Sequence, residues 1–154
     1  MKFLIGILLV MTCTYISFRL SDKYTIRKNF FNTFLQFTKI LKNEVSFSKR
    51  TILSLLKDKQ CDKDLFYSVV TNYFNNKDFT FDNKHFSNDE KEHLKSFLEE
   101  IGKTNSGLQY EFLSTTEKTI GEKLAVLQEE EKKYKNLYLK LGFLLGILLF
   151  VLII

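Results

Sequence analysis

Residues 141–154 read LGFLLGILLFVLII, a run without a single polar side chain. An α-helix rises about 1.5 Å per residue, so this run alone covers about 21 Å. With residues 137–139, and with the long side chain of Lys140 reaching for the interface, the segment is long enough to cross a bilayer. A buried core helix is the alternative, but a small domain cannot shield a run that lacks any polar face. We therefore predict a transmembrane helix over residues 137–154.

A second apolar segment opens the chain. From Phe3 to Phe18 the sequence contains no acidic or basic residue. The alternatives are a cleaved signal peptide and a lipoprotein anchored through Cys13. However, residues 11–17 contain no alanine for a cleavage site, and Thr12 is larger than the residue expected before a lipidated cysteine. We therefore predict an uncleaved transmembrane helix over residues 1–20.

Basic residues flank the inner ends of both apolar segments: Arg19, Lys23, Arg27 and Lys28 at the first, and Lys132, Lys133, Lys135 and Lys140 at the second. The positive-inside rule then places residues 21–136 in the cytoplasm and both termini outside. These cations account for the formal net charge of +5 and would attract anionic headgroups. No motif of a nucleic-acid-binding fold accompanies them. We predict a two-pass protein of the cell membrane that does not bind nucleic acid.

The composition of residues 21–136 favours an all-α domain with one core. The whole chain has no proline and only 6 glycines, so the usual helix-breaking residues are rare. Cys13 in the first anchor and Cys61 in the central domain cannot pair, which fits a reducing cytoplasm. We predict a helical bundle between an N-terminal and a C-terminal transmembrane helix.

Apolar residues at helical spacing define the elements of this bundle. One stripe continues from the first anchor and consists of Phe30, Phe34, Phe37, Leu41 and Val45. A short element that begins with Ile52–Leu56 follows, and then a helix from about Leu65 to Phe74 that Asp62 or Asp64 caps. Residues 79–81 alternate like a strand but have no pairing partner, so we expect an extended loop with aromatic anchors.

The second half of the domain contains a capped helix and a very long one. Ser87 and Glu90 have the spacing of a capping box before the apolar residues Leu94, Phe97, Leu98 and Ile101, and Gly102 suits the helix end. From Ser106 the helical pattern runs into the second anchor, which predicts one helix of about 70 Å. Its heptad positions include Leu124, Leu127, Glu131, Tyr134 and Tyr138. Packing on its own domain is favoured over an intermolecular coiled coil.

The sequence offers no set of residues for catalysis or for metal or cofactor binding. His85 and His93 have no neighbouring cysteine or histidine at ligand spacing, and we expect both to be exposed. The run Glu129–Glu131 is typical of a solvated helix face. Gly142 and Gly146 form a small-xxx-small pair, which lets another membrane helix approach closely. We predict a non-enzymatic protein without cofactors, in which Gly142 and Gly146 mediate membrane-helix packing.

Three segments resemble the stage III sporulation protein AB family, and the resemblance extends over the whole chain. Residues 134–149 resemble its terminal Leu-Gly-Phe-Leu-x-Gly membrane helix. Residues 94–102 with Gln109 resemble its Leu-x-x-Phe-x-x-x-Leu-Gly…Gln segment, and residues 41–47 its Leu-x-x-Glu-Ile-x-aromatic helix. The chain departs from the family pattern at residues 50–52, where the family has Thr-Pro-Leu, and at Leu98, where the family has glycine.

The resemblance implies a central domain similar to the F platform domain of type II secretion systems. It further implies a place in the mother-cell membrane around the forespore, within the channel complex of endospore formation. The implied partners are other stage III sporulation channel proteins and a cytoplasmic secretion-type ATPase, stage III sporulation protein AA; self-association is left open. Glu99, Glu100 and Glu44 are candidates for partner contact. The alternatives are a two-anchor adaptor of another secretion or division assembly and, less favoured, a small membrane-bound hydrolase using these glutamates.

Overall fold

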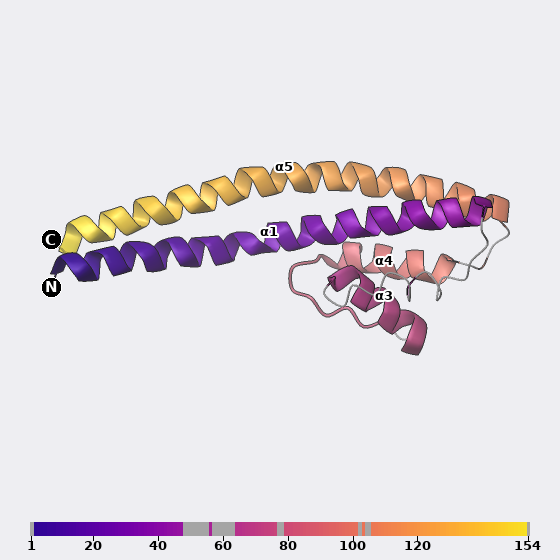
Figure 1. The fold of residues 1–154 in the computed structure, drawn as a ribbon, viewed down its shortest axis with the longest axis horizontal. Helices are drawn as coiled ribbons and strands as arrows, with labels where there is room; N and C mark the ends of the chain where they lie inside the picture. Colours follow the sequence, from indigo (N-terminus) through magenta and orange to yellow (C-terminus); the bar gives the residue numbers. More distant parts are fainter. Residues whose placement is uncertain are drawn as a thin grey trace. The chain divides into compact units, whose positions relative to one another are not determined.

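The computed structural model describes residues 2–47, 56, 64–76, 79–101, 103 and 106–153. These residues form four helices and no strand: α1 (Lys2–Phe47), α3 (Leu65–Asn76), α4 (Asn88–Glu100) and α5 (Ser106–Ile153) (Figure 1). The predicted all-α class is confirmed, and so is the single long helix that continues into the second anchor. The predicted element at Ile52–Leu56 lies outside the described residues except for Leu56, which is helical and buried. Cys61, Asp62 and Gly102 also lie outside them.

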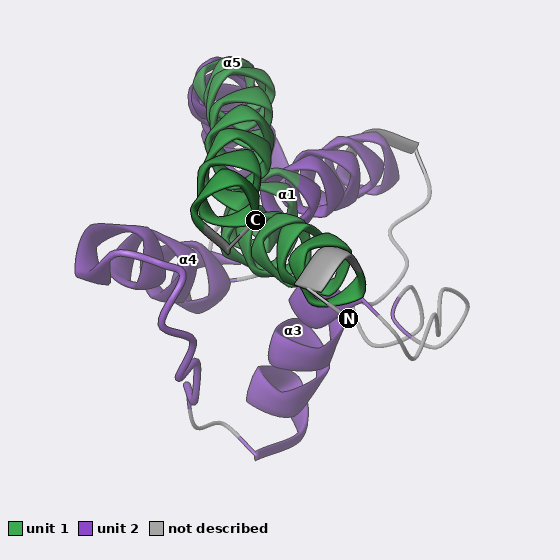
Figure 2. Ribbon diagram, turned by 90° about the vertical axis from the view of Figure 1, so that its left-hand side faces the viewer, with its two compact units in different colours: residues 1–28, 125–154 green, residues 29–124 purple. Residues whose placement is uncertain are grey.

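The chain divides into two compact units, which Figure 2 shows in different colours. Unit 1 consists of Met1–Lys28 and Ala125–Ile154, and unit 2 consists of Asn29–Leu124. Helices α1 and α5 therefore each contribute one part to unit 1 and another to unit 2, whereas α3 and α4 belong to unit 2 alone.

Unit 2 has a core made largely of phenylalanine rings. The predicted α1 stripe is confirmed in Phe30, Phe34, Phe37 and Leu41, which are buried, whereas Val45 is half-buried. The ring of Phe34 lies 5.1 Å from that of Phe66 in α3 and 4.6 Å from that of Phe97 in α4, measured between centroids. Such aromatic pairs add specific geometry to the burial of large apolar surfaces. The core thus joins α1 to both short helices.

Local signals set the beginnings of α3 and α4. One carboxylate oxygen of Asp64 accepts a hydrogen bond from the backbone N–H of Phe66 (3.0 Å), and the other accepts one from the hydroxyl of Thr33 (2.7 Å). At α4 the predicted capping box is confirmed, because Glu90 N–H donates to Ser87 Oγ (3.2 Å) and Ser87 N–H donates to Glu90 Oε2 (3.0 Å). In each helix, a backbone N–H group of the first turn that has no partner within the helix thereby gains a side-chain acceptor.

The segment between α3 and α4 is anchored by aromatic side chains, as expected. Its described residues from Phe79 onward form no strand, and Phe81 and Phe86 are buried. The centroids of these two rings lie 5.3 Å and 4.8 Å from that of Phe30. Ring packing against Phe30 of α1 therefore holds this segment in place, although it has no regular backbone pairing.

In unit 1 the first part of α1 and the last part of α5 run antiparallel, and both chain ends lie at the same end of the pair (Figure 1). Both helices are long and apolar enough to cross a membrane. Many of their large apolar side chains point outward, for example Leu4 (70% exposed) and Leu144 (62% exposed). Since an exposed apolar surface of this extent marks an interaction site, its outward position fits contact with lipid.

Candidate functional site

The predicted packing residues Gly142 and Gly146 lie against α1 of the same chain. A Cβ atom at Gly146 would lie 3.0 Å from Cα of Val10, and one at Gly142 would collide with the Ser17 side chain and lie 3.1 Å from the Cys13 carbonyl oxygen. A third glycine, Gly6, faces the ring of Phe150 in the same way. Sequence reasoning missed Gly6 because it has no second small residue four positions away. Gly142 and Gly146 allow the two backbones to approach closely, whereas Gly6 leaves room for the Phe150 ring.

Beyond the anchors, a polar contact joins the same two helices within unit 1. Lys28 Nζ lies 2.8 Å from Glu131 Oε2, and the hydroxyl of Thr25 donates to Glu131 Oε1 at 2.9 Å. Arg27 and Glu130 form a longer ion pair of 3.6 Å. Burial tends to raise the pKa of Glu131, but the ammonium of Lys28 and the hydroxyl of Thr25 outweigh it and hold this pKa below its usual range. Glu131 therefore stays ionised at neutral pH.

The contact of Glu131 with Lys28 and Thr25 explains why a charged residue occupies a heptad core position of α5. Tyr134 stacks on Tyr24 with ring centroids 4.8 Å apart and planes inclined by 12°, and Leu127 is buried. Residues 127–134 of α5 thus face residues 24–28 of α1. The favoured interpretation, packing of the long helix on its own domain (residues 21–136), agrees with these contacts.

The three candidate glutamates for partner contact lie near the ends of two helices of unit 2. Figure 1 shows that α1 and α4 end at the same end of unit 2, where α5 begins. Glu100 is exposed, and Glu99 forms a 3.8 Å pair with Lys95. Glu44 differs, because its Oε2 atom is buried and has no hydrogen-bond partner. Glu99 and Glu100 are thus accessible to another protein, whereas Glu44 is only partly so.

Close to Glu44, the side chains of Lys42 in α1 and Glu117 in α5 form an ion pair. The hydrogen bond to Glu117 raises the pKa of Lys42 above its ordinary value. The Lys42 ammonium also lies 5.8 Å from the centre of the Tyr110 ring. This cluster fastens α1 to α5 in unit 2 by charge and ring contacts together.

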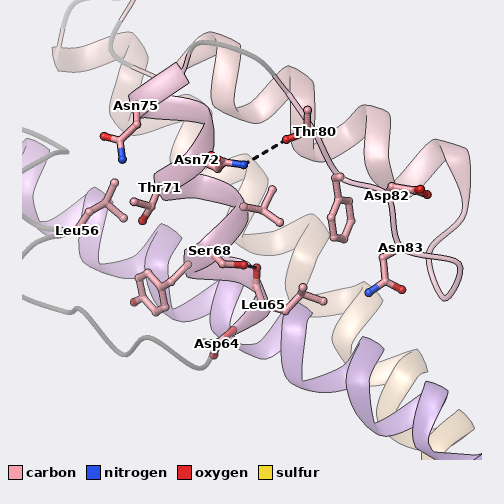
Figure 3. A pocket seen from close by; sticks show the side chains of 13 residues that line it. Leu56, Asp64, Leu65, Ser68, Thr71, Asn72, Asn75, Thr80, Asp82 and Asn83 are labelled. Atoms are coloured by element: carbon pink, nitrogen blue, oxygen red, sulfur yellow. Dashed lines mark hydrogen bonds between the residues drawn. The ribbon is translucent and has the colours of Figure 1, made fainter.

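A cavity of about 510 Å³ lies in unit 2 between α3 and the segment that follows it (Figure 3). Asn72 spans part of it by donating from Nδ2 to the hydroxyl of Thr80 at 3.3 Å. Asp64, at its edge, is already engaged in capping α3. The lining consists of amides, hydroxyls, two carboxylates and apolar groups: Leu56, Asp64, Leu65, Tyr67, Ser68, Val69, Thr71, Asn72, Asn75, Thr80, Phe81, Asp82 and Asn83. Among the described residues the polar groups of this lining are hydroxyls, amides and carboxylates, which suit hydrogen bonding to a polar ligand.

Neither histidine lines this cavity. His85 and His93 are both exposed, as predicted. Across the described ranges, no group of three or more histidine, cysteine, aspartate or glutamate side chains is arranged to hold a metal ion.

The fold and these contacts define an all-α protein with two long helices apolar enough to span a membrane, near the start and the end of the chain, which pack closely through glycines. The chain matches the family model of stage III sporulation protein AB over residues 2–154, and it belongs to that family. No curated protein and no solved structure is significantly similar to it.

Proposed function

We propose that this chain is the membrane platform component of the channel complex between mother cell and forespore in endospore formation, and that it docks a cytoplasmic secretion-type ATPase. The observation that carries this proposal is the family match over residues 2–154 together with two long apolar helices, one near each end of the chain. Such a chain would present a helical domain at a membrane. The ATPase, of the stage III sporulation protein AA type, would supply the energy.

The proposed docking surface includes Glu99 and Glu100 at the end of α4. Neither side chain belongs to the buried core of unit 2: Glu100 is exposed, and the side chain of Glu99, although paired with Lys95, is 44% exposed. Charged groups at an interface govern encounter and specificity more than affinity alone. An acidic helix end therefore suits a basic patch on the ATPase.

Reversing both charges tests this surface. In the full chain, we expect Glu99→Lys with Glu100→Lys to weaken capture of the ATPase in detergent at least tenfold and to make the remaining binding less sensitive to salt. The matched control is Glu111→Lys with Glu122→Lys, which changes the same charge at two exposed positions of α5 and should leave capture unchanged. Circular dichroism must be the same for all three proteins. Equal capture by both double variants would exclude Glu99 and Glu100 as the docking surface, and failure of the parent chain to capture the ATPase would refute docking.

The proposed topology places residues 21–136 in the cytoplasm and both termini outside, in the mother-cell membrane. We expect a membrane-impermeant thiol reagent to label Lys2→Cys in intact cells and to leave Asn76→Cys unlabelled, both in a background without Cys13 and Cys61. Asn76 is exposed in unit 2, so lysis should make it reactive and serves as the control. Labelling of Asn76→Cys before lysis would reverse the orientation.

A further inference from the structure

Glu130 and Glu131 of α5 turn toward α1, and this leaves the opposite face of the helix cationic. These two glutamates pair with Arg27 and Lys28 inside unit 1. On the outward side, Lys132, Lys133 and Lys140 are exposed, and no carboxylate lies within ion-pair distance of Lys133 or Lys140 in the described part of the chain. Glu129, four residues before Lys133 on the same side of the helix, is also exposed.

Lys133, Asn136 and Lys140 share one face of α5, because positions three, four and seven residues apart lie on the same side of a helix. All three are exposed. The two lysines lie two turns apart, about 10 Å along the axis, and their flexible four-carbon stems allow both ammonium groups to converge on one anion beside Asn136. The Lys133 ammonium also lies 5.7 Å from the centre of the Tyr134 ring, which restrains its position.

The same face continues directly as an apolar stripe. Leu144, Leu148 and Val151 follow Lys140 at helical spacing and are 62%, 59% and 68% exposed. An exposed apolar stripe of this kind is stabilised by contact with another apolar surface. Lys133 and Lys140 lie at its N-terminal end, toward the central domain. Cations followed by a long apolar stripe match the phosphate and the acyl chains of a phospholipid.

We propose that Lys133, Asn136 and Lys140 bind the headgroup phosphate of an anionic phospholipid whose acyl chains lie along Leu144, Leu148 and Val151. Arg27 and Lys28, by contrast, are engaged with glutamates and serve to hold α1 against α5. The cations near the anchors thus divide into a structural set and a lipid-binding set. This inference rests on membrane insertion of α5, which belongs to the proposed function.

The experiment uses an introduced tryptophan as a local reporter, since the chain has none. The full chain carrying Leu144→Trp is reconstituted into vesicles of phosphatidylcholine or phosphatidylglycerol with brominated acyl chains, which quench tryptophan fluorescence on contact. Mixtures of a brominated and an unbrominated lipid give the relative affinity of the site for the two headgroups. We expect at least about fivefold preference for phosphatidylglycerol, because a lysine near an anionic surface contributes about 1 kcal/mol.

Lys133→Gln with Lys140→Gln should reduce this preference to about onefold. The control, Lys84→Gln with Lys118→Gln, removes the same charge at two exposed positions of unit 2 and should retain it. The proposal is overturned if the parent shows no preference, or if the Lys133 and Lys140 variant keeps it. Absence of quenching by either brominated lipid would show that α5 is not in the bilayer, and the proposed membrane role would fail as well.

Discussion

Replacing Phe34 by alanine should destabilise unit 2 by about 3–5 kcal/mol, the range for deleting a fully buried aromatic ring. The side chain is 1% exposed, and its ring contacts Phe66 of α3 and Phe97 of α4. Its removal would leave a cavity at the point where α1 meets both short helices. The measurement is a urea titration of the full chain in a mild detergent, followed by near-ultraviolet circular dichroism.

The matched control is Phe143→Ala, which removes the same ring from a side chain that is 53% exposed. We expect a change below about 1 kcal/mol there, since exposed positions lose little packing. If both variants unfold at the same urea concentration, Phe34 does not form the centre of the core.

Much of this core could be predicted because apolar residues recur every three or four positions along one face of α1. Phe34, Phe37 and Leu41 follow that spacing and are buried. Phe31 and Thr38 were missed, because a helix packed by neighbours on more than one side also buries residues outside its main stripe. The hydroxyl of Thr38 donates a hydrogen bond to the carbonyl of Phe34 at 3.0 Å, which lets this polar side chain be buried. Because threonine is polar, the apolar pattern of the sequence could not predict that it is buried.

Long-range contacts could not be predicted in the same way. The Thr25–Glu131 hydrogen bond depends on the register of two helices that meet only in the folded chain. The heptad pattern showed that Glu131 is a charged residue at a core position, but it could not identify Lys28 as the partner in its ion pair. Likewise, both Asp62 and Asp64 had the chemistry of a cap, and the fold identifies Asp64 as the residue that bonds the first turn of α3.

Replacing Gly146 by leucine should separate the two anchor helices without preventing their insertion. A Cβ atom at this position would lie 3.0 Å from Cα of Val10, which is backbone and cannot rotate away as a side chain does. Overpacking of a close contact typically costs about 1–3 kcal/mol, and a leucine adds three more carbon atoms to the same space. The substitution remains apolar, so the hydrophobic length of α5 is unchanged.

The separation can be followed by energy transfer between dyes on Leu4→Cys and Leu152→Cys, in a background without Cys13 and Cys61. Both positions are exposed and close in sequence to the two chain ends, which lie at the same end of unit 1 (Figure 1). Addition of sodium dodecyl sulfate to a mild detergent should abolish transfer at a lower concentration in Gly146→Leu than in the parent.

Gly121 is the matched control for this experiment, because it is also a glycine within α5 but nothing lies within 4 Å of the Cβ that it would carry. Gly121→Leu should therefore not lower the midpoint of the transition, and both Gly121→Leu and Gly121→Ala should stabilise the helix by up to about 1 kcal/mol through their higher helix propensity. The contrast separates close helix packing from a general effect of replacing glycine in a helix. Equal resistance of Gly146→Leu and the parent would mean that the glycines of the second anchor are incidental to its contact with α1. In that case the small-xxx-small pair would remain free for a helix of another protein, and the same variant would then have to be tested for loss of partner helices on purification.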